Sequence, residues 1–466
     1  MVRPGGLLAA ALLGAAAVAA AVTDVAARAA TPMTDEATLN ALRTYLRIRT
    51  DHPAPDYDAA VTHLRGLCEA AGMTTAVHTF VPGKPVLLCS RPGTTAGARS
   101  VLLNSHTDVV PAEAAKWTVD PFAASDVDGS IYARGVQDMK TIGIQYIAAV
   151  SRLPPLPRPI YLTFVPDEEI GGVDGMGAFA ASSAFPPLRV GMALDEGLPT
   201  PASHVRVFTG ERQPWWVSLR VSGTPGHGAT LPSTTAVGRL GAALAAVAAH
   251  RSAEAAKLAA GTPLGATVGV NVVYMRAGVV NDAVPAGFVM NMIPSSAEAG
   301  MDVRVPPTVD AAAVEATILG WLSAACVGGA DAALPGGGGQ PPLFEWTTVC
   351  EGVSFRYTHK VDVPIVSPLE PAANDFAGAF VDAMAGAGVA WREDIFPAAT
   401  DARFLRERGV PVFGMSVMTA TPELLHRGGE RLGVAAVAEG VRVYGGGVGA
   451  LAAVPLTAAD AAAGGD

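Results

Sequence analysis

Short apolar segments that alternate with helical segments constrain the fold of this chain more than any other feature. The apolar runs are VLLN at 101–104, IYLTFV at 160–165, VGMAL at 190–194 and VPVFGMSV at 410–417. A strand that is apolar on both faces is buried on both faces, which is typical of a parallel sheet covered by helices. Helical segments such as MKTIGIQYIAAVSRL at 139–153 supply that cover. The sequence therefore predicts an α/β domain with a mainly parallel sheet.

The middle of the chain has a different pattern. WWVSLRVSG at 215–223 alternates like a half-exposed strand, and an alanine-rich helix is predicted over 234–260. TVGVNVVYMRAG at 267–278 and AEAGMDVRVPP at 297–307 are also strand-like. Helices on one face of an antiparallel sheet make an α+β unit. We expect this unit to be inserted into the α/β domain, with ALPGGGGQPP at 333–342 as a flexible exit loop.

Composition excludes some classes of protein. Of the 466 residues, 32 are Lys or Arg and 42 are Asp or Glu, which gives a formal net charge of −10. A chain with this charge and with no basic tract is not expected to bind nucleic acid. The four cysteines, Cys68, Cys89, Cys326 and Cys350, form no C-x-x-C pair. We therefore expect neither a disulfide framework nor a thiolate zinc site, and interpret these cysteines as small buried hydrophobic residues.

The amino terminus contains twenty uncharged residues, from Pro4 to Thr23, after a single Arg3. This leader is typical of a signal peptide or signal anchor, and it is long enough to consider a membrane span. Alanine is only weakly hydrophobic, so a permanent anchor is the less favoured interpretation. An organellar presequence is a further alternative.

Acidic residues and imidazoles follow the apolar strands. VLLNSHTD ends in His106 and Asp108, IYLTFVPDEE ends in Glu168 and Glu169, and VGMALDEG ends in Glu196. In an open parallel sheet, functional groups collect at the carboxyl ends of the strands. The sequence therefore predicts a site at this edge, and because no thiolate pair exists, its metal ligands are expected to be imidazole and carboxylate.

The spacing of these residues suits a metal centre. His106 and Asp108 are two apart, so they face the same way on an extended backbone, and the acid can steady the imidazole. Glu168 and Glu169 are adjacent and diverge, so that one can bind metal while the other acts as a general base. Two divalent cations would in turn need a bridging carboxylate, and Asp138, before a predicted helix, is the candidate.

Each of these residues also has an ordinary structural explanation. Taken alone, His106 can be a hydrogen-bonded core histidine, Asp138 a helix cap and Glu196 a turn acid. His426, in TPELLHRGGE, can be an ordinary helix or loop imidazole. All of these separate explanations would have to be true at once, and none of them explains why the residues occur at the ends of strands. A metal site is therefore the better hypothesis.

Several longer motifs occur in a fixed order. They are LLNSHTDVVP, YARGVQDMK, TFVPDEEIGG, ALDEG, PGH, ATDARF and LLH. In this order they resemble the M20 metallopeptidases, and within them the N-acyl-L-amino-acid amidohydrolases, over roughly residues 34–455. The resemblance implies a di-zinc catalytic domain with an inserted lid domain through which two subunits form a homodimer.

The resemblance also implies roles for individual residues. His106, Asp138 and Glu196 would hold one Zn²⁺, and Asp138, Glu169 and His426 the second, with Asp138 as the bridge. Glu168 would accept the proton from water, and Asp108 would orient His106. The remaining roles concern substrate, and they would belong to His227, Asn291 and Arg403. Asn281 is an alternative to Asn291, because the segment VVNDAVPAGFVMNMIP is longer than the usual link in this family.

With these roles, the chain divides into four segments. They are a hydrophobic leader at 1–31, an amino-terminal portion of the catalytic domain at 32–211, the inserted lid and dimerisation domain at 212–335, and a carboxy-terminal portion of the catalytic domain at 336–466. The family is mostly cytosolic, whereas the leader indicates a secretory or organellar route, so both localisations stay open.

The expected function is zinc-dependent hydrolysis of N-acyl-L-amino acids to a carboxylate and a free amino acid, with aliphatic side chains on the substrate. A dipeptidase or carboxypeptidase of the same family is the nearest alternative, because its substrates also present an amide beside a free carboxylate. A non-catalytic binding protein on the same scaffold is a third hypothesis. The full set of five ligands together with Glu168 argues against it.

Overall fold

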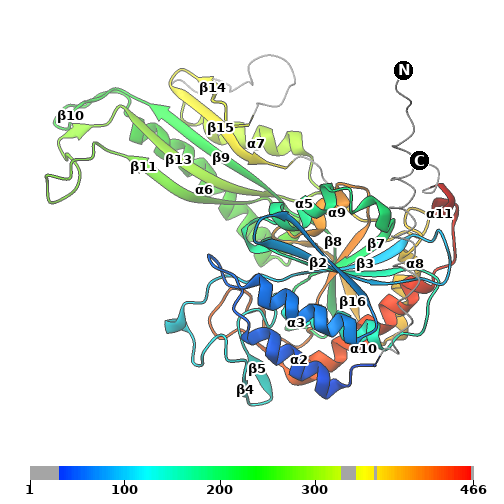
Figure 1. Cartoon of the computed structure of the whole chain (residues 1–466). Helices are drawn as coiled ribbons and strands as arrows, with labels where there is room; N and C mark the ends of the chain where they lie inside the picture. The colour runs from blue at the N-terminus through cyan, green and yellow to red at the C-terminus, as the bar shows by residue number, and fades with distance from the viewer. Residues whose placement is uncertain (1–30, 327–342, 362–364, 463–466) are drawn as a thin grey trace, which may run out of the picture. The chain divides into compact units, whose positions relative to one another are not determined.

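The computed structural model describes residues 31–326, 343–361 and 365–462 (Figure 1). The chain forms two compact units, the first from residues 1–205, 375–390 and 416–466, the second from residues 206–374 and 391–415. The predicted leader, apart from residue 31, and the predicted exit loop at 333–342 lie outside the described residues. Within the described ranges, no helix has both the length and the apolar character that crossing a bilayer requires.

The first unit contains a mixed sheet with a parallel centre. Its strands run in the order β1-β2-β6-β3-β7 and are β1 (Thr74–Val81), β2 (Lys84–Arg91), β3 (Ser100–His106), β6 (Ile160–Val165) and β7 (Val190–Asp195). β3 pairs in parallel with β6 on one side and β7 on the other. β1 and β2 form an antiparallel hairpin, and β2 pairs antiparallel with β6. A small second sheet joins β18 (Arg431–Gly433), β5 (Ser130–Tyr132) and β4 (Ser125–Val127).

Helices form the rest of the first unit. They are α2 (Asp35–Arg47), α3 (Tyr57–Ala70), α4 (Lys140–Ser151), α5 (Ala178–Ala181), α8 (Ala377–Gly386), α10 (Val434–Ala453) and α11 (Ala458–Ala462). Thr34 and Asp56 cap α2 and α3 by accepting a backbone N–H three residues on. Every residue of α4 is buried, which explains its apolar sequence on all sides. The α/β fold class predicted from the alternating pattern is confirmed.

The second unit holds two groups of strands. β17 (Val412–Met415), β8 (Val205–Glu211) and β16 (Trp391–Phe396) are neighbours in that order. The other group is an antiparallel sheet in the order β11 (Gly269–Ala277), β13 (Ser296–Val305), β9 (Gln213–Ser222), β15 (Val353–Lys360) and β14 (Thr347–Cys350). A short pair joins β10 (Gly226–His227) to β12 (Met292–Ile293). The helices of this unit are α6 (Ala236–Ala259), α7 (Ala311–Ser323) and α9 (Ala402–Arg406).

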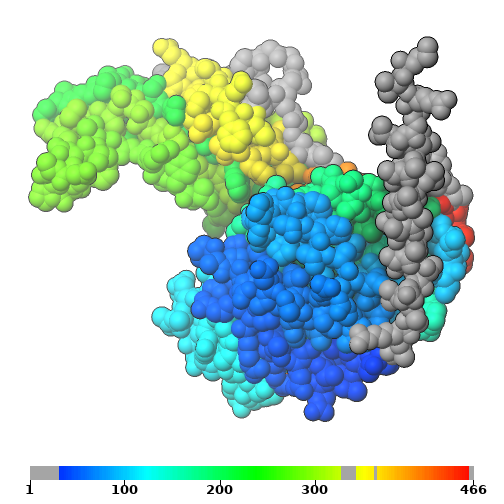
Figure 2. Space-filling model, in the orientation of Figure 1, coloured from blue at the N-terminus to red at the C-terminus, as the bar shows by residue number. Residues whose placement is uncertain are grey.

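The core of the five-stranded sheet lies on one face. Alternate residues of β9, such as Trp215 and Leu219, are buried in a cluster with residues of α6 and α7, whereas Trp216 and Arg220 are exposed. This is the half-exposed alternation that the sequence predicts. The sheet and its helices form an elongated body, drawn in green and yellow in Figures 1 and 2. Because β14 and β15 extend this sheet to residue 360, its strands continue past residue 335, and the four-segment division itself stays a prediction.

The interpretation of the cysteines as unpaired hydrophobic residues was wrong. Cys68 on α3 is disulfide-bonded to Cys89 on β2, and Cys326 after α7 is bonded to Cys350 on β14. The Cα atoms of these pairs are 6.3 and 6.1 Å apart. Local spacing detects only neighbouring cysteines, whereas here the packing of a helix on a strand brings distant ones together.

Candidate metal centre

The strands of the first unit bring predicted site residues to one edge of its sheet. His106 is the last residue of β3, Glu168 lies three residues beyond the end of β6, and Glu196 follows β7 directly. Because these three strands are parallel, their carboxyl ends meet. The side chains of His106 and Glu196 are buried, with His106 Nε2 3.9 Å from Oε2 of Glu196.

Asp138 lies between two histidines. Its Oδ1 is 2.9 Å from Nε2 of His106, and its Oδ2 is 3.0 Å from Nε2 of His426. The side chain does not serve as a helix cap, because α4 begins after Met139 without any side-chain capping bond. The two oxygens of one buried carboxylate are therefore directed to two different imidazoles, as a carboxylate that bridges two cations requires.

The two adjacent glutamates belong to different groups. Donor atoms of His106, Asp138 and Glu169 lie within 4.8 Å of one another, and so do those of His106, Glu168 and Glu196. Glu169 Oε2 is 3.1 Å from Nε2 of His426, whereas its buried Oε1 has no hydrogen-bond partner among the described residues. A buried oxygen without a donor is costly, and a cation would satisfy it.

The electrostatics of the cluster show a shortage of positive charge. Burial, and next the charge of Asp138, raise the pKa of Glu169, and the same causes raise that of Glu196 well above its ordinary value. The imidazole of His426 donates hydrogen bonds to the carboxylates of Asp138 and Glu169, and these bonds raise its pKa to about 10. Burial contributes more to the shifts of the two glutamates than repulsion between the carboxylates does.

Asp108 contacts the backbone of the acidic loop. Its Oδ1 accepts the N–H of Glu168 at 3.1 Å, and its Oδ2 accepts the N–H of Glu169 at 3.0 Å. Its backbone carbonyl lies 3.0 Å from Nδ1 of His106, and its carboxylate 3.6 Å from the same nitrogen. Asp108 therefore contacts the imidazole, as expected, and also the two residues that follow Asp167.

Two residues without a role predicted from the sequence, His52 and Asp167, lie beside Asp108. The Nε2 atom of His52 is 2.9 Å from Oδ2 of Asp108, and its side chain is only 14% exposed. Asp167 accepts from the hydroxyl of Tyr57 at 2.6 Å and forms an ion pair with Lys84. No local pattern in the sequence indicates these contacts, because each joins segments far apart in the chain.

The three residues assigned to substrate lie in the second unit. His227 is exposed on β10, which pairs with β12, and the N–H of Gly228 donates to the carbonyl of Asn291 at 2.7 Å. Asn281 uses its Oδ1 in a local turn by accepting the N–H of Ala283 at 3.0 Å. Arg403 on α9 donates to the carbonyl of Thr400 at 3.2 Å. His227 and Asn291 are thus neighbours, while Arg403 lies on a separate element.

The α/β sheet with imidazoles and carboxylates at its strand ends defines a class, the metal-dependent hydrolases. Comparison with protein families narrows this class. The model of peptidase family M20/M25/M40 matches residues 102–448. This chain belongs to that family.

Comparison with individual proteins is more specific than the family match. It is 38% identical to aminoacylase-1 of Mus musculus, over 91% of this chain and 97% of the mouse protein. It is 37% identical to aminoacylase-1 of Homo sapiens, over 92% and 98% of the two chains. Among solved structures, a dinuclear metal-binding peptidase of the M20 family from Bacillus subtilis has the same fold. Its TM-score is 0.59 at 15% identity, over 90% of this chain and 100% of that one.

Proposed function

We propose that this protein hydrolyses N-acyl-L-amino acids to a carboxylate and a free L-amino acid. The observation that supports this most directly is the arrangement around Asp138, whose two oxygens face His106 and His426 beside the Glu168–Glu169 pair. This is the site of a two-metal hydrolase. The relatives named aminoacylase-1, which match along nearly their whole length, favour the N-acyl amino acid as substrate.

The residues fit a pair of divalent cations, and we assign them as Zn²⁺. His106, Asp138 and Glu196 would hold one cation, and Asp138, Glu169 and His426 the other. Imidazole nitrogen and carboxylate oxygen are zinc ligands, and Oε1 of Glu169, which has no hydrogen-bond partner among the described residues, is a suitable ligand atom. When bound, such cations supply Lewis acidity, which polarises a carbonyl and lowers the pKa of water toward about 7.

Glu168 is assigned as the general base. Its backbone N–H is held by Asp108, and its side chain belongs to the group with His106 and Glu196. It accepts a proton from the attacking water as the oxygen adds to the acyl carbonyl. The same carboxyl group then returns that proton to the amide nitrogen, so that the C–N bond breaks with a neutral amine as the leaving group.

Arg403 is assigned to the free carboxylate of the substrate. With Glu211 and Gln213 it lines a cavity of about 20 Å³ in the second unit. A guanidinium binds a carboxylate through two parallel hydrogen bonds, which an ammonium cannot reproduce. Arg403→Lys should therefore raise KM more than it lowers kcat in steady-state kinetics, and an unchanged KM would remove the residue from this role.

His227 and Asn291 are assigned to the scissile amide, and the inserted domain is assigned to the interface of a homodimer. β11 lies at the edge of the five-stranded sheet, and it exposes Val273 and Met275. An edge strand with exposed apolar side chains can pair with a second copy of itself. Light scattering of the purified protein tests this assignment, and a monomer at all concentrations would contradict it.

A substrate panel tests the proposed activity. N-acetyl-L-methionine should be hydrolysed with a higher kcat/KM than a dipeptide with methionine at its carboxyl end. A chelator should abolish turnover, and added Zn²⁺ should restore it. Preference for the dipeptide would instead indicate a dipeptidase or carboxypeptidase. A protein that binds no zinc and stays inert when zinc is added would indicate a binding protein.

A further inference from the structure

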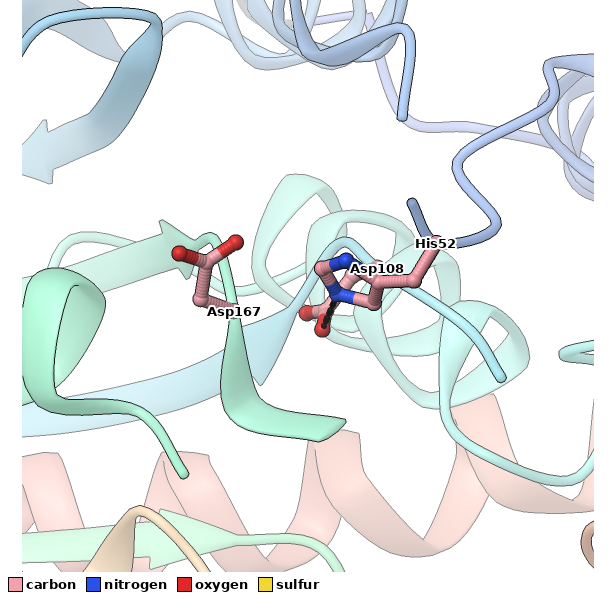
Figure 3. A group of neighbouring side chains, drawn as sticks. All are labelled: His52, Asp108 and Asp167. Atoms are coloured by element: carbon pink, nitrogen blue, oxygen red, sulfur yellow. Dashed lines mark hydrogen bonds and ion pairs between the residues drawn. The ribbon is translucent and has the colours of Figure 1, made fainter. Parts of the chain in front are cut away.

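His52 lies in a third group of potential ligands. Donor atoms of His52, Asp108 and Asp167 lie within 4.8 Å of one another. Figure 3 shows the imidazole of His52 against Asp108, with Asp167 beside them at the end of the neighbouring strand. This group has the residue types of a metal site. Whether it could bind a cation depends on which protein groups already contact its carboxylate oxygens.

Protein groups already occupy this cluster. Asp167 accepts from the hydroxyl of Tyr57, and that hydroxyl in turn accepts the N–H of Asp167 at 3.0 Å. Lys84 provides the positive charge beside the other oxygen of Asp167. Asp108 accepts two backbone N–H groups and the imidazole. A cation would have to displace these donors, so the geometry points to an internal support and not to a third metal.

The backbone places His52 at this position. The N–H of Val109 donates to the carbonyl of Thr50 at 3.0 Å, and Asp51 and Val109 form a parallel bridge. Residues 50–52 therefore run beside the segment that follows β3. Both carboxylate oxygens of Asp108 already accept backbone N–H groups, Oδ1 that of Glu168 at 3.1 Å and Oδ2 that of Glu169 at 3.0 Å. Asp108 is therefore the acceptor in its contact with His52, and Nε2 of His52 is the donor.

We propose that His52 is a positioning residue of the hydrolytic site. Its Nε2–H fixes the carboxylate of Asp108, which in turn holds the backbone N–H groups of Glu168 and Glu169 and so sets where the base and the metal ligand point. The inference rests on the proposed function for its kinetic readout. It predicts an effect on metal affinity as well. Mutation of a residue that hydrogen-bonds to and orients the metal ligands usually lowers that affinity by about 10–100-fold.

Two substitutions of His52 by an amide side chain distinguish a positioning hydrogen bond from simple packing. In His52→Gln the amide nitrogen has about the reach of Nε2, whereas in His52→Asn the same group is one methylene too short. His63→Asn is the control, because His63 is a partly buried histidine of the same unit whose Nε2 contacts the carbonyl of Ala41 at 3.0 Å. Each variant is stripped with a chelator, reloaded with Zn²⁺, and titrated against a chromophoric zinc chelator. Kinetics with N-acetyl-L-methionine follow.

We expect His52→Asn to weaken zinc binding about 10-fold and to lower kcat about 10-fold with KM within about 2-fold. His52→Gln should recover both to within about 3-fold, and His63→Asn should change neither. In an Asp108→Asn background, His52→Asn should add little, because the two residues act as one unit.

Each of three results would overturn the proposal. The first is a zinc affinity and a kcat in His52→Asn that equal those of the wild type, and the second is an equal decrease of both in His52→Gln and His52→Asn. The third is that the decreases caused by His52→Asn and Asp108→Asn are fully additive in the double variant. If the wild-type protein turns over no N-acyl amino acid, the proposed function fails. The zinc titration still decides the role of His52 in that case, because it needs no substrate.

Discussion

Glu168 and Glu169 are adjacent in the chain, yet their side chains belong to different groups of the site. Both lie in one short 3-10 turn, Glu168–Ile170, which Asp167 precedes with a φ of 65° and Gly171 and Gly172 follow with φ angles of 114° and 62°. Such left-handed conformations suit glycine, which has no Cβ. The tight loop directs one carboxylate toward His426 and the other toward Glu196.

The separation of these two groups gives a prediction for Glu168. Glu168→Gln should lower kcat by about 10²–10⁴-fold, because it removes a general base. It should leave bound zinc near the wild-type amount, because Glu168 is not among the proposed ligands. Kinetics and metal analysis on the same preparation check this. Near-normal turnover in the variant would rule out Glu168 as the base.

Asp138 gives a second prediction at this scale. Because its two oxygens face both histidines, Asp138→Ala should lose more zinc than Ala at His106 or Glu196, each of which serves a single cation. Elemental analysis after dialysis measures the remaining metal. Equal loss from the three variants would count against a bridge.

At the scale of elements, two disulfides connect helices to strands. The Cys68–Cys89 bond joins α3 to β2, and both cysteines are fully buried. The bond closes a segment with a sequence separation of 21. A cross-link of this kind stabilises a protein mainly by restricting the unfolded chain.

Removing this bond should therefore change stability more than catalysis. A Cys68→Ser, Cys89→Ser double variant should lose about 2–4 kcal/mol of unfolding free energy. Its activity at room temperature should stay near wild type, because neither cysteine belongs to the metal cluster. Urea denaturation followed by circular dichroism measures the loss. If this variant unfolds at the same urea concentration as the wild-type protein, the disulfide bond contributes little to stability.

At the scale of the whole molecule, the residues assigned to the reaction come from both units. The proposed ligands and Glu168 belong to the first unit, and His227 to the second. In the proposed homodimer, the partner subunit's His227 would complete each site. An oxyanion donor acts mainly in the transition state, so His227→Ala should lose about 10²–10³-fold in kcat.

Subunit exchange tests action between subunits. The homodimers of His227→Ala and Glu168→Gln should each be nearly inactive. After dissociation and mixing in equal amounts, half of the dimers are mixed, and each mixed dimer has one complete site. About one quarter of wild-type activity should return. No recovery after verified exchange would place His227 within its own subunit or outside the mechanism.

Much of this molecule follows from local sequence pattern. The cap at Thr34, the helix over residues 140–151, and the strands that end at His106 and before Glu168 are set by residue periodicity and hydrogen bonding within a few residues. The rule that parallel strands end at one edge then predicts which side chains meet. For that reason the sequence indicated the set of strand-end ligands that the structure brings together around Asp138.

Tertiary structure decided the contacts that join distant segments. The two disulfides, the β1–β2 hairpin beside β6, and the bond from His52 to Asp108 all depend on how elements pack. Periodicity reports only on neighbours in the chain, whereas these contacts form between residues that are 21 to 77 positions apart. Local chemistry therefore indicated the proposed ligands, and packing determined which residues hold them in place.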